Sequence, residues 1–179
     1  MTDATSMRND RAARFAEFDA NTEYGMFIGD EVVAAQSGQT FRMYDTFEEA
    51  EWGYVPVAAA PDVDRAVRAA RAAFQTWSKT PAAARSQILA QWAALVREHA
   101  EELARLQVHE NGKTITEMRG STQGVAAMGD YAAQLIHTLH GQTITPMVPD
   151  HDVWTRREPV GVVAAITPGT TRWSCCLGS

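Results

Sequence analysis

The sequence has 179 residues, a formal net charge of −6 at pH 7, 45% hydrophobic residues and 21% charged residues. These proportions exclude an intrinsically disordered chain, and the negative charge argues against a nucleic-acid-binding protein. No apolar run approaches the ~18 residues of a membrane span, and residues 1–20 lack the apolar segment of a secretory signal. We therefore expect a cytoplasmic protein of one domain or slightly more, with neither a nucleic-acid nor a membrane partner.

Residues 26–33 are rich in β-branched and aromatic side chains, and Gly29-Asp30 interrupts them near the centre. This pattern predicts a β-hairpin. The same enrichment at Phe41–Tyr44 and Tyr54–Val57 predicts a second pair of strands.

From Pro61 onward the hydrophobic period changes from two residues to 3.6, which indicates helices. Pro61 suits the first helical position, where a missing N–H costs nothing. Thr80-Pro81 predicts the start of a second, long helix, with Thr80 as its N-cap. Asn111-Gly112 predicts its end, because both residues tolerate a left-handed backbone. The apolar stripe of the first helix consists of Val63, Ala66, Val67, Ala70, Phe74 and Trp77.

A third helix is predicted over Thr114–Leu139, with Gly141 as its C′ residue. His137 and His140 lie three residues apart near its C-terminus. A metal pair is one interpretation, but the sequence supplies no third ligand. We favour imidazoles placed at the negative end of the helix dipole, and we assign no metal ligand to this chain.

Arg65, Arg68 and Arg71 repeat every third residue along the first helix. A basic binding patch and a solvated helix face are both consistent with this spacing. We favour the solvated face, because the whole chain is acidic.

After Pro149 the sequence predicts extended structure. Residues 153–158 indicate a strand that ends at Pro159, and residues 160–166 form a short, continuous apolar run. Such a run is typical of a central parallel strand that is buried on both faces. In an open α/β sheet, ligands bind at the carboxyl ends of these strands, which here is Thr167-Pro168.

The stretch from Arg156 to Pro168 closely resembles the segment that opens the nucleotide-binding sheet of aldehyde dehydrogenases. Residues 55–74, 110–113 and 139–146 agree with the same family in order and spacing. The resemblance runs from Phe27 to Pro168. One departure is Tyr44–Phe47, where the family has a turn that contains Asn-Pro.

This resemblance implies an α/β fold of which the chain is the N-terminal part: helix-rich, with small β-hairpins and only the first strand of the Rossmann-type sheet. The implied divisions are an arm (1–25), the front of the nucleotide-binding domain with its hairpins and three helices (26–142), the start of the oligomerisation strands (143–158), the first sheet strand (159–168) and a tail unlike the family (169–179).

The implied activity is NAD(P)-dependent oxidation of an aldehyde to a carboxylic acid, in a protein that is a homo-oligomer when intact. Ile166, Thr167 and Pro168 are the implied contacts to NAD or NADP, through their backbone and through the Thr167 side chain. We expect the Ile166 side chain to lie in the core. The family's nucleophilic Cys, general-base Glu and oxyanion-binding Asn all lie beyond Pro168, so we assign no catalytic residue and expect this chain as written to be inactive.

Residues 169–179 depart abruptly from the family pattern. Loss of one T after the Pro168 codon would explain this, because the restored frame permits Trp-Asn followed by an apolar run. Cys175 and Cys176 would then be accidental. A nucleophilic cysteine is the alternative, but no histidine, acid or helix N-terminus is placed to activate it.

Two further hypotheses remain at this point. The chain is a non-catalytic interaction module that pairs with an intact subunit through its strand edges, or it is an unrelated helical protein that forms a stable monomer. On the family interpretation, helices that should cover the sheet leave their apolar faces exposed.

Overall fold

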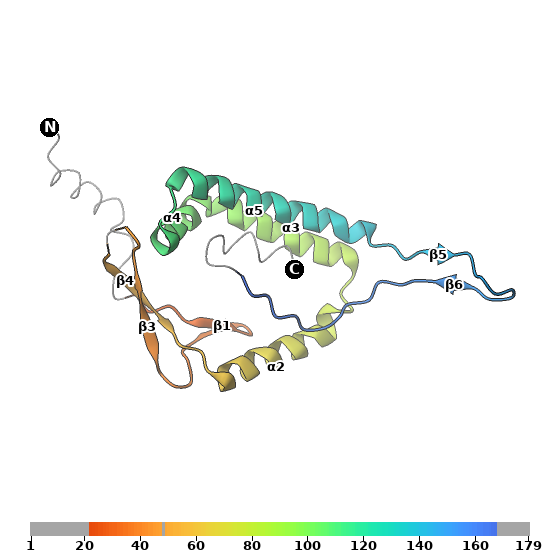
Figure 1. Cartoon of the computed structure of the whole chain (residues 1–179), viewed down its shortest axis with the longest axis horizontal. Coiled ribbons are helices and arrows are strands. Elements are labelled where there is room, and N and C mark those ends of the chain that lie inside the picture. The colour runs from red at the N-terminus through yellow and green to blue at the C-terminus, as the bar shows by residue number, and fades with distance from the viewer. Residues whose placement is uncertain (1–21, 48, 168–179) are drawn as a thin grey trace. The chain divides into compact units, whose positions relative to one another are not determined.

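The computed structural model describes residues 22–47 and 49–167 (Figure 1). The chain divides into two compact units. The first holds the described part of residues 1–69 together with residues 109–112, and the second holds residues 70–108 and the described part of 113–179. The predicted arm and tail lie largely or wholly outside the described residues. None of the described helices is long and apolar enough to cross a membrane.

Two antiparallel hairpins build the first unit, as the sequence predicts. Strands β1 (Met26–Ile28) and β2 (Glu31–Val33) pair around Gly29, whose φ of 68° suits the tight turn. Strands β3 (Thr40–Tyr44) and β4 (Glu51–Pro56) form the second hairpin. The buried apolar residues of this unit are Ile28, Ala35 and Trp52.

Helix α2 (Ala60–Trp77) begins one residue before Pro61, which takes the second helical position rather than the first. Asp62 holds the entry to this helix: its carboxylate accepts hydrogen bonds from the backbone N–H groups of Ala59 and Gln36, both at 2.9 Å. These two bonds lower the pKa of Asp62. Arg65, Arg68 and Arg71 are exposed, and Arg65 lies 3.3 Å from Glu31, so the prediction of a solvated face is confirmed.

The second unit centres on helices α3 (Ala82–Glu98) and α5 (Ile115–Leu135), which lie side by side (Figure 1). Its core consists of Val96, Val125 and Ala126, with Trp92 and Leu103 packed against them. The hydroxyl of Ser86 donates to the carbonyl of Ala133 at 2.8 Å and ties the two helices together.

The single long helix predicted after Thr80 is wrong: the structure has α3 and then α4 (Ala100–Asn111), divided at His99. Acidic residues at Glu101 and Glu102 stabilise a new helix start there. Thr80 is not an N-cap, because its hydroxyl instead donates to the Thr76 carbonyl at the end of α2. Gly112 follows α4 with a φ of 70°, which confirms the predicted helix end.

Helix α5 has Thr114 as its N-cap, and the Thr114 hydroxyl accepts from the Glu117 N–H at 3.3 Å. The α-helix ends earlier than predicted, at Leu135, and continues as the short 3-10 helix η1 (Ile136–Thr138).

Beyond η1 the sequence-based strand assignments are only partly confirmed. Strands β5 (Thr143–Ile144) and β6 (Val153–Trp154) form a short antiparallel pair, so the predicted strand at 153–158 is much shorter than expected. Residues 157–167 form neither helix nor strand. The sheet strand expected over 159–168 stays a prediction: residues 159–167 form no strand, and the strands of the described part make three separate two-stranded antiparallel sheets. A parallel strand needs hydrogen-bonding neighbours, and the described residues supply none there.

The side chain of Ile166 was expected in the core but is 97% exposed, and Val160 is 93% exposed. The apolar stripe of α2 is also open to solvent at Val63, Val67 and Trp77, as predicted for helices that lack the sheet they should cover. The architecture is thus α/β: helices with small antiparallel strand pairs.

Candidate functional site

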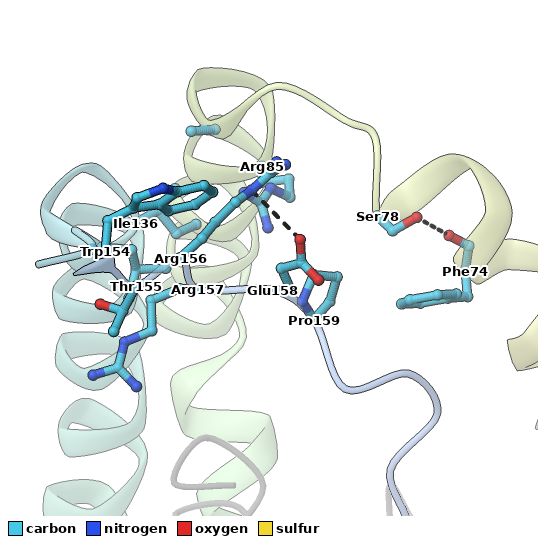
Figure 2. Close-up of a pocket in the computed structure, with 13 residues that line it drawn as sticks. Phe74, Ser78, Arg85, Ile136, Trp154, Thr155, Arg156, Arg157, Glu158 and Pro159 are labelled. Carbon is cyan, nitrogen blue, oxygen red and sulfur yellow. Dashed lines mark hydrogen bonds and ion pairs between the residues drawn. The ribbon is translucent and has the colours of Figure 1, made fainter. Parts of the chain in front are cut away.

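A hollow of about 960 Å³ lies within the second unit (Figure 2). Its wall comes from four places: the end of α2, the first turn of α3, the segment around η1, and the chain from β6 onward. The residues that line it are Phe74, Ser78, Ala82, Arg85, Ile136, Leu139, Gly141, Trp154, Thr155, Arg156, Arg157, Glu158 and Pro159.

Arginine side chains dominate the charge of this hollow: Arg85, Arg156 and Arg157 line it, against the single carboxylate of Glu158. The guanidinium Nε of Arg156 lies 3.6 Å from Glu158 Oε1, and both side chains are largely exposed. In Figure 2 the Arg156 side chain extends toward Arg85 and Glu158, whereas Arg157 turns away. The lining is therefore net positive, in a chain whose overall charge is negative.

Arg85 differs from its neighbours because its Nε atom is buried and has no hydrogen-bond partner among the described residues. A buried donor without a partner is destabilising, and the cost is greater for a charged group. Native proteins satisfy nearly all such atoms. The Arg85 Nε is therefore a buried donor of the second unit for which the described residues supply no acceptor.

Gly141 determines the shape of the hollow at its hairpin side. A Cβ at this position would lie 1.9 Å from the carbonyl oxygen of Thr155. Two hydrogen bonds hold the adjoining strands together. The Thr155 N–H donates to the Gln142 carbonyl at 2.8 Å, and the Gln142 N–H donates to the Thr155 hydroxyl at 2.9 Å. The prediction of Gly141 as a helix C′ residue is wrong, since the helical segment ends at Thr138. The glycine permits close approach of two backbones.

The predicted cofactor contacts are not part of this hollow. Ile166 is exposed and Thr167 is half-buried, and neither lines it. Pro168 lies outside the described residues. The backbone of residues 160–167 belongs to no described strand, so the role of Ile166 and Thr167 toward NAD or NADP stays a prediction.

His137 and His140, the histidine pair singled out from the sequence, are both exposed. Over the described ranges no three His, Cys, Asp or Glu side chains are grouped so that they could hold a metal ion. Cys175 and Cys176 lie outside those ranges.

A buried polar pair in the first unit was not predicted from the sequence. The Nδ1 atom of His109 makes a short hydrogen bond with Asp45 Oδ2, and both side chains are at least nine-tenths buried. The other carboxylate oxygen of Asp45 accepts from the Phe47 N–H at 2.8 Å, and the ring of Trp52 lies 5.9 Å from that of His109. These contacts hold the turn between β3 and β4, which indicates a structural role.

The sequence carries a signal for Arg85 in the spacing of the residues around it. Arg85, Leu89, Trp92 and Val96 are spaced at i, i+4, i+7 and i+11, so the arginine extends the apolar stripe of α3. A cation at such a position is partly buried by the helix geometry and needs a partner.

Comparison with known proteins identifies the class. The sequence matches the aldehyde dehydrogenase family over residues 32–169, and the chain therefore belongs to that family. It is 37% identical over 142 residues to malonate-semialdehyde dehydrogenase 1 of Geobacillus thermodenitrificans, which covers 79% of this chain and 29% of that protein.

Solved structures agree with the sequence match. An NADP-dependent enzyme of E. coli has a TM-score of 0.83 at 28% identity, over 87% of this chain and 32% of the other. A double mutant of the betaine aldehyde dehydrogenase of Staphylococcus aureus, solved with NAD+, has a TM-score of 0.80 at 27% identity, over 94% of this chain and 33% of the other. The chain thus spans about 29% of the length of the curated relatives it matches.

Proposed function

We propose that the whole protein oxidises an aldehyde to a carboxylic acid with NAD or NADP. The observation that carries this proposal is the family match over residues 32–169 together with the fold similarity to NAD- and NADP-linked enzymes. The cofactor would accept a hydride from the substrate. The contribution of this chain is to position the cofactor through the backbone of Ile166, Thr167 and Pro168.

The described part of this segment is compatible with that role. Residues 160–167 form no strand, and Ile166 is almost fully exposed, so a cofactor could reach the chain at Ile166. The catalytic thiol, general base and oxyanion donor would come from family positions beyond Pro168.

We further propose that residues 169–179 arise from the loss of one T after the Pro168 codon. The support is that one inserted base permits Trp-Asn and an apolar run, which is the family's continuation. Resequencing across this codon tests it. An extra T, with an open frame that leads to a Cys and a Glu in family context, would support the proposal. Genomic DNA that encodes residues 169–179 as they stand in this sequence, with no extra T, would refute it.

The activity test uses both forms of the protein. The 179-residue chain should produce no NADH or NADPH from malonate semialdehyde or betaine aldehyde, because it lacks the family's catalytic positions. The frame-restored protein should reduce the cofactor with at least one aldehyde of a tested panel. Cofactor reduction by the 179-residue chain alone would contradict the assignment of the chemistry to positions beyond Pro168.

We propose that the frame-restored protein is a cytoplasmic homo-oligomer. Cell fractionation would test its location, and gel filtration would test its oligomeric state.

A second candidate is a non-catalytic module that pairs with an intact aldehyde dehydrogenase subunit. The observation that favours it is the exposed apolar surface of the hairpin and the chain after it: Trp154 is 66% and Val160 93% exposed. Exposed strand edges and apolar patches favour association. Co-purification with a tagged full-length relative supports this role, and recovery of the chain alone in the presence of that relative argues against it.

A further inference from the structure

A seven-residue apolar stretch, residues 160–166, lies in the described chain without forming a strand. We propose that it is a self-association segment. Copies of this chain bind one another by pairing residues 160–166 as antiparallel strands of an intermolecular β-sheet. The partner is therefore a second copy of this chain, and further copies add at the open edges of the sheet.

The first observation is the composition of the segment, in which four of the seven residues are β-branched, none is charged and none is proline. Segments of six or seven residues with high β-propensity and low net charge are the ones that stack as strands between chains. The residues are Val160, Gly161, Val162, Val163, Ala164, Ala165 and Ile166.

The second observation is that the side chains and the backbone of this segment are both available. Val160 is 93%, Val163 61% and Ile166 97% exposed. Among the residues that the structure describes, none forms a backbone hydrogen bond with residues 160–166. An exposed stretch with unpaired N–H and C=O groups is a template for another chain. Pairing would satisfy these groups and cover apolar surface at the same time.

Self-complementarity identifies a second copy as the partner. An antiparallel pair centred on Val163 places residue 160 opposite 166, residue 161 opposite 165 and residue 162 opposite 164. Each β-branched side chain then faces a β-branched or a small one, which are favourable cross-strand neighbours. The paired stretch carries no charge, so identical chains do not repel each other there.

The residues on either side of the segment set the orientation and the length of the pairing. Arg156 and Arg157 precede it and are exposed. Parallel pairing in register would place each arginine beside its own copy, whereas antiparallel pairing sends them to opposite ends. Pro159 and Pro168 lack the N–H that a sheet needs, so the pairing is limited to the residues between them. Gly161, with a φ of 113°, must become extended, which glycine does without steric cost.

The inference concerns the 179-residue chain and does not depend on the proposed activity, because its readout is association. Sedimentation velocity over a series of protein concentrations measures the size of the species. Two strands alone make a marginal sheet, so we expect species larger than a dimer to appear as the concentration rises. Hydrogen exchange followed by mass spectrometry should show slower exchange at residues 160–166 in these species. A chain that stays monomeric, or one that associates without this protection, would overturn the inference.

The variant Val163→Lys should raise the concentration at which half of the chain is associated by about tenfold or more. Each strand loses the burial of a valine, and like charges come to oppose each other. Val63→Lys is the matched control, because Val63 is 55% exposed on α2 and its replacement adds the same charge outside the segment. Circular dichroism checks that both variants keep their helices. Equal effects of the two variants would assign the association to exposed apolar surface in general and would overturn the inference.

Cysteine variants test the antiparallel arrangement in a chain whose Cys175 and Cys176 are replaced by serine. A mixture of Val160→Cys and Ile166→Cys, oxidised with oxidised glutathione, should give a disulfide between the two variants, since opposite residues of an antiparallel pair lie within disulfide reach. Disulfides that form only between identical variants would show parallel pairing and overturn this arrangement. Binding to a tagged full-length relative without self-association would favour the interaction module described above and would also overturn the inference.

Discussion

The indole ring of Trp92 lies directly against the backbone of Gly129. A Cβ at residue 129 would stand 2.8 Å from Trp92 Cζ3 and 3.1 Å from the Cβ of Ala93. Gly129 and Ala93 are both buried, on α5 and α3. The closeness of these two helices therefore depends on the absence of a side chain at Gly129.

Replacing Gly129 with Ala should destabilise the second unit even though Ala favours the helix. The added methyl overpacks the Trp92 contact, which typically costs about 1–3 kcal/mol. Gly124→Ala is the matched control on the same helix: nothing lies within 4 Å of its Cβ position, so the better helix propensity should stabilise by about 0.5–1 kcal/mol. Urea unfolding followed by circular dichroism measures both. Equal stabilisation by the two variants would contradict the packing described here.

Thr114→Ala should lower the free energy of unfolding by about 1 kcal/mol, because the Thr114 hydroxyl caps α5 by accepting from the Glu117 N–H. Thr80→Ala should change it by less than about 0.5 kcal/mol, since Thr80 caps no helix and only donates to the Thr76 carbonyl. The comparison uses the same unfolding assay. A larger loss of unfolding free energy in Thr80→Ala than in Thr114→Ala would show that Thr80 caps a helix, as the sequence predicts.

Asp45→Ala should destabilise the first unit by about 1–3 kcal/mol, because it removes the buried acceptor of both His109 Nδ1 and the Phe47 N–H. Asp64→Ala, at an exposed position of α2, is the control and should have little effect. Thermal unfolding followed by tryptophan fluorescence checks the result. If the two variants melt at the same temperature, the pair does not hold the turn.

Acid should weaken the contact between α4 and α5. The Arg119 guanidinium lowers the pKa of Glu101 from an ordinary value of 4.5 to about 2. Desolvation raises this pKa, and a second hydrogen bond, from Arg105, lowers it further. The two side chains are joined by bonds of 2.6 and 2.7 Å. Because the pKa is lower in the folded state, this stabilisation is fully present above pH 4.5 and is lost as the pH falls toward 2.

The variant Arg119→Met isolates this effect. It should melt slightly below the wild type at pH 7, by less than about 4 °C because the pair is half-exposed. The difference should shrink as the pH approaches 2 and when salt is added. A difference in melting temperature that is constant from pH 7 to pH 2 would exclude a contribution from the Glu101 charge.

Local chemistry made several elements predictable from the sequence. The hairpin at residues 26–33 follows from β-branched residues around Gly29, and the end of α4 follows from the left-handed backbone that Gly112 permits. The family was also recognisable, since motifs such as residues 156–168 keep their order and spacing. The hairpin and helix-end signals depend on residues that are close together in the sequence, and the family signal depends on the order of short motifs along the chain.

Contacts between distant residues decided the rest. Gly141 is required by the Thr155 carbonyl, and Asp45 meets His109 across 64 positions. The apolar run at residues 160–166 predicts a strand, but a strand forms only when other strands supply hydrogen bonds, and none of the described residues does so there. Arg85 looks like one more polar residue of a helix until folding buries its Nε beside a hollow. The sequence by itself thus determined the local elements and the family, whereas packing alone decided which polar atoms lack a partner, because burial is a property of the folded chain as a whole.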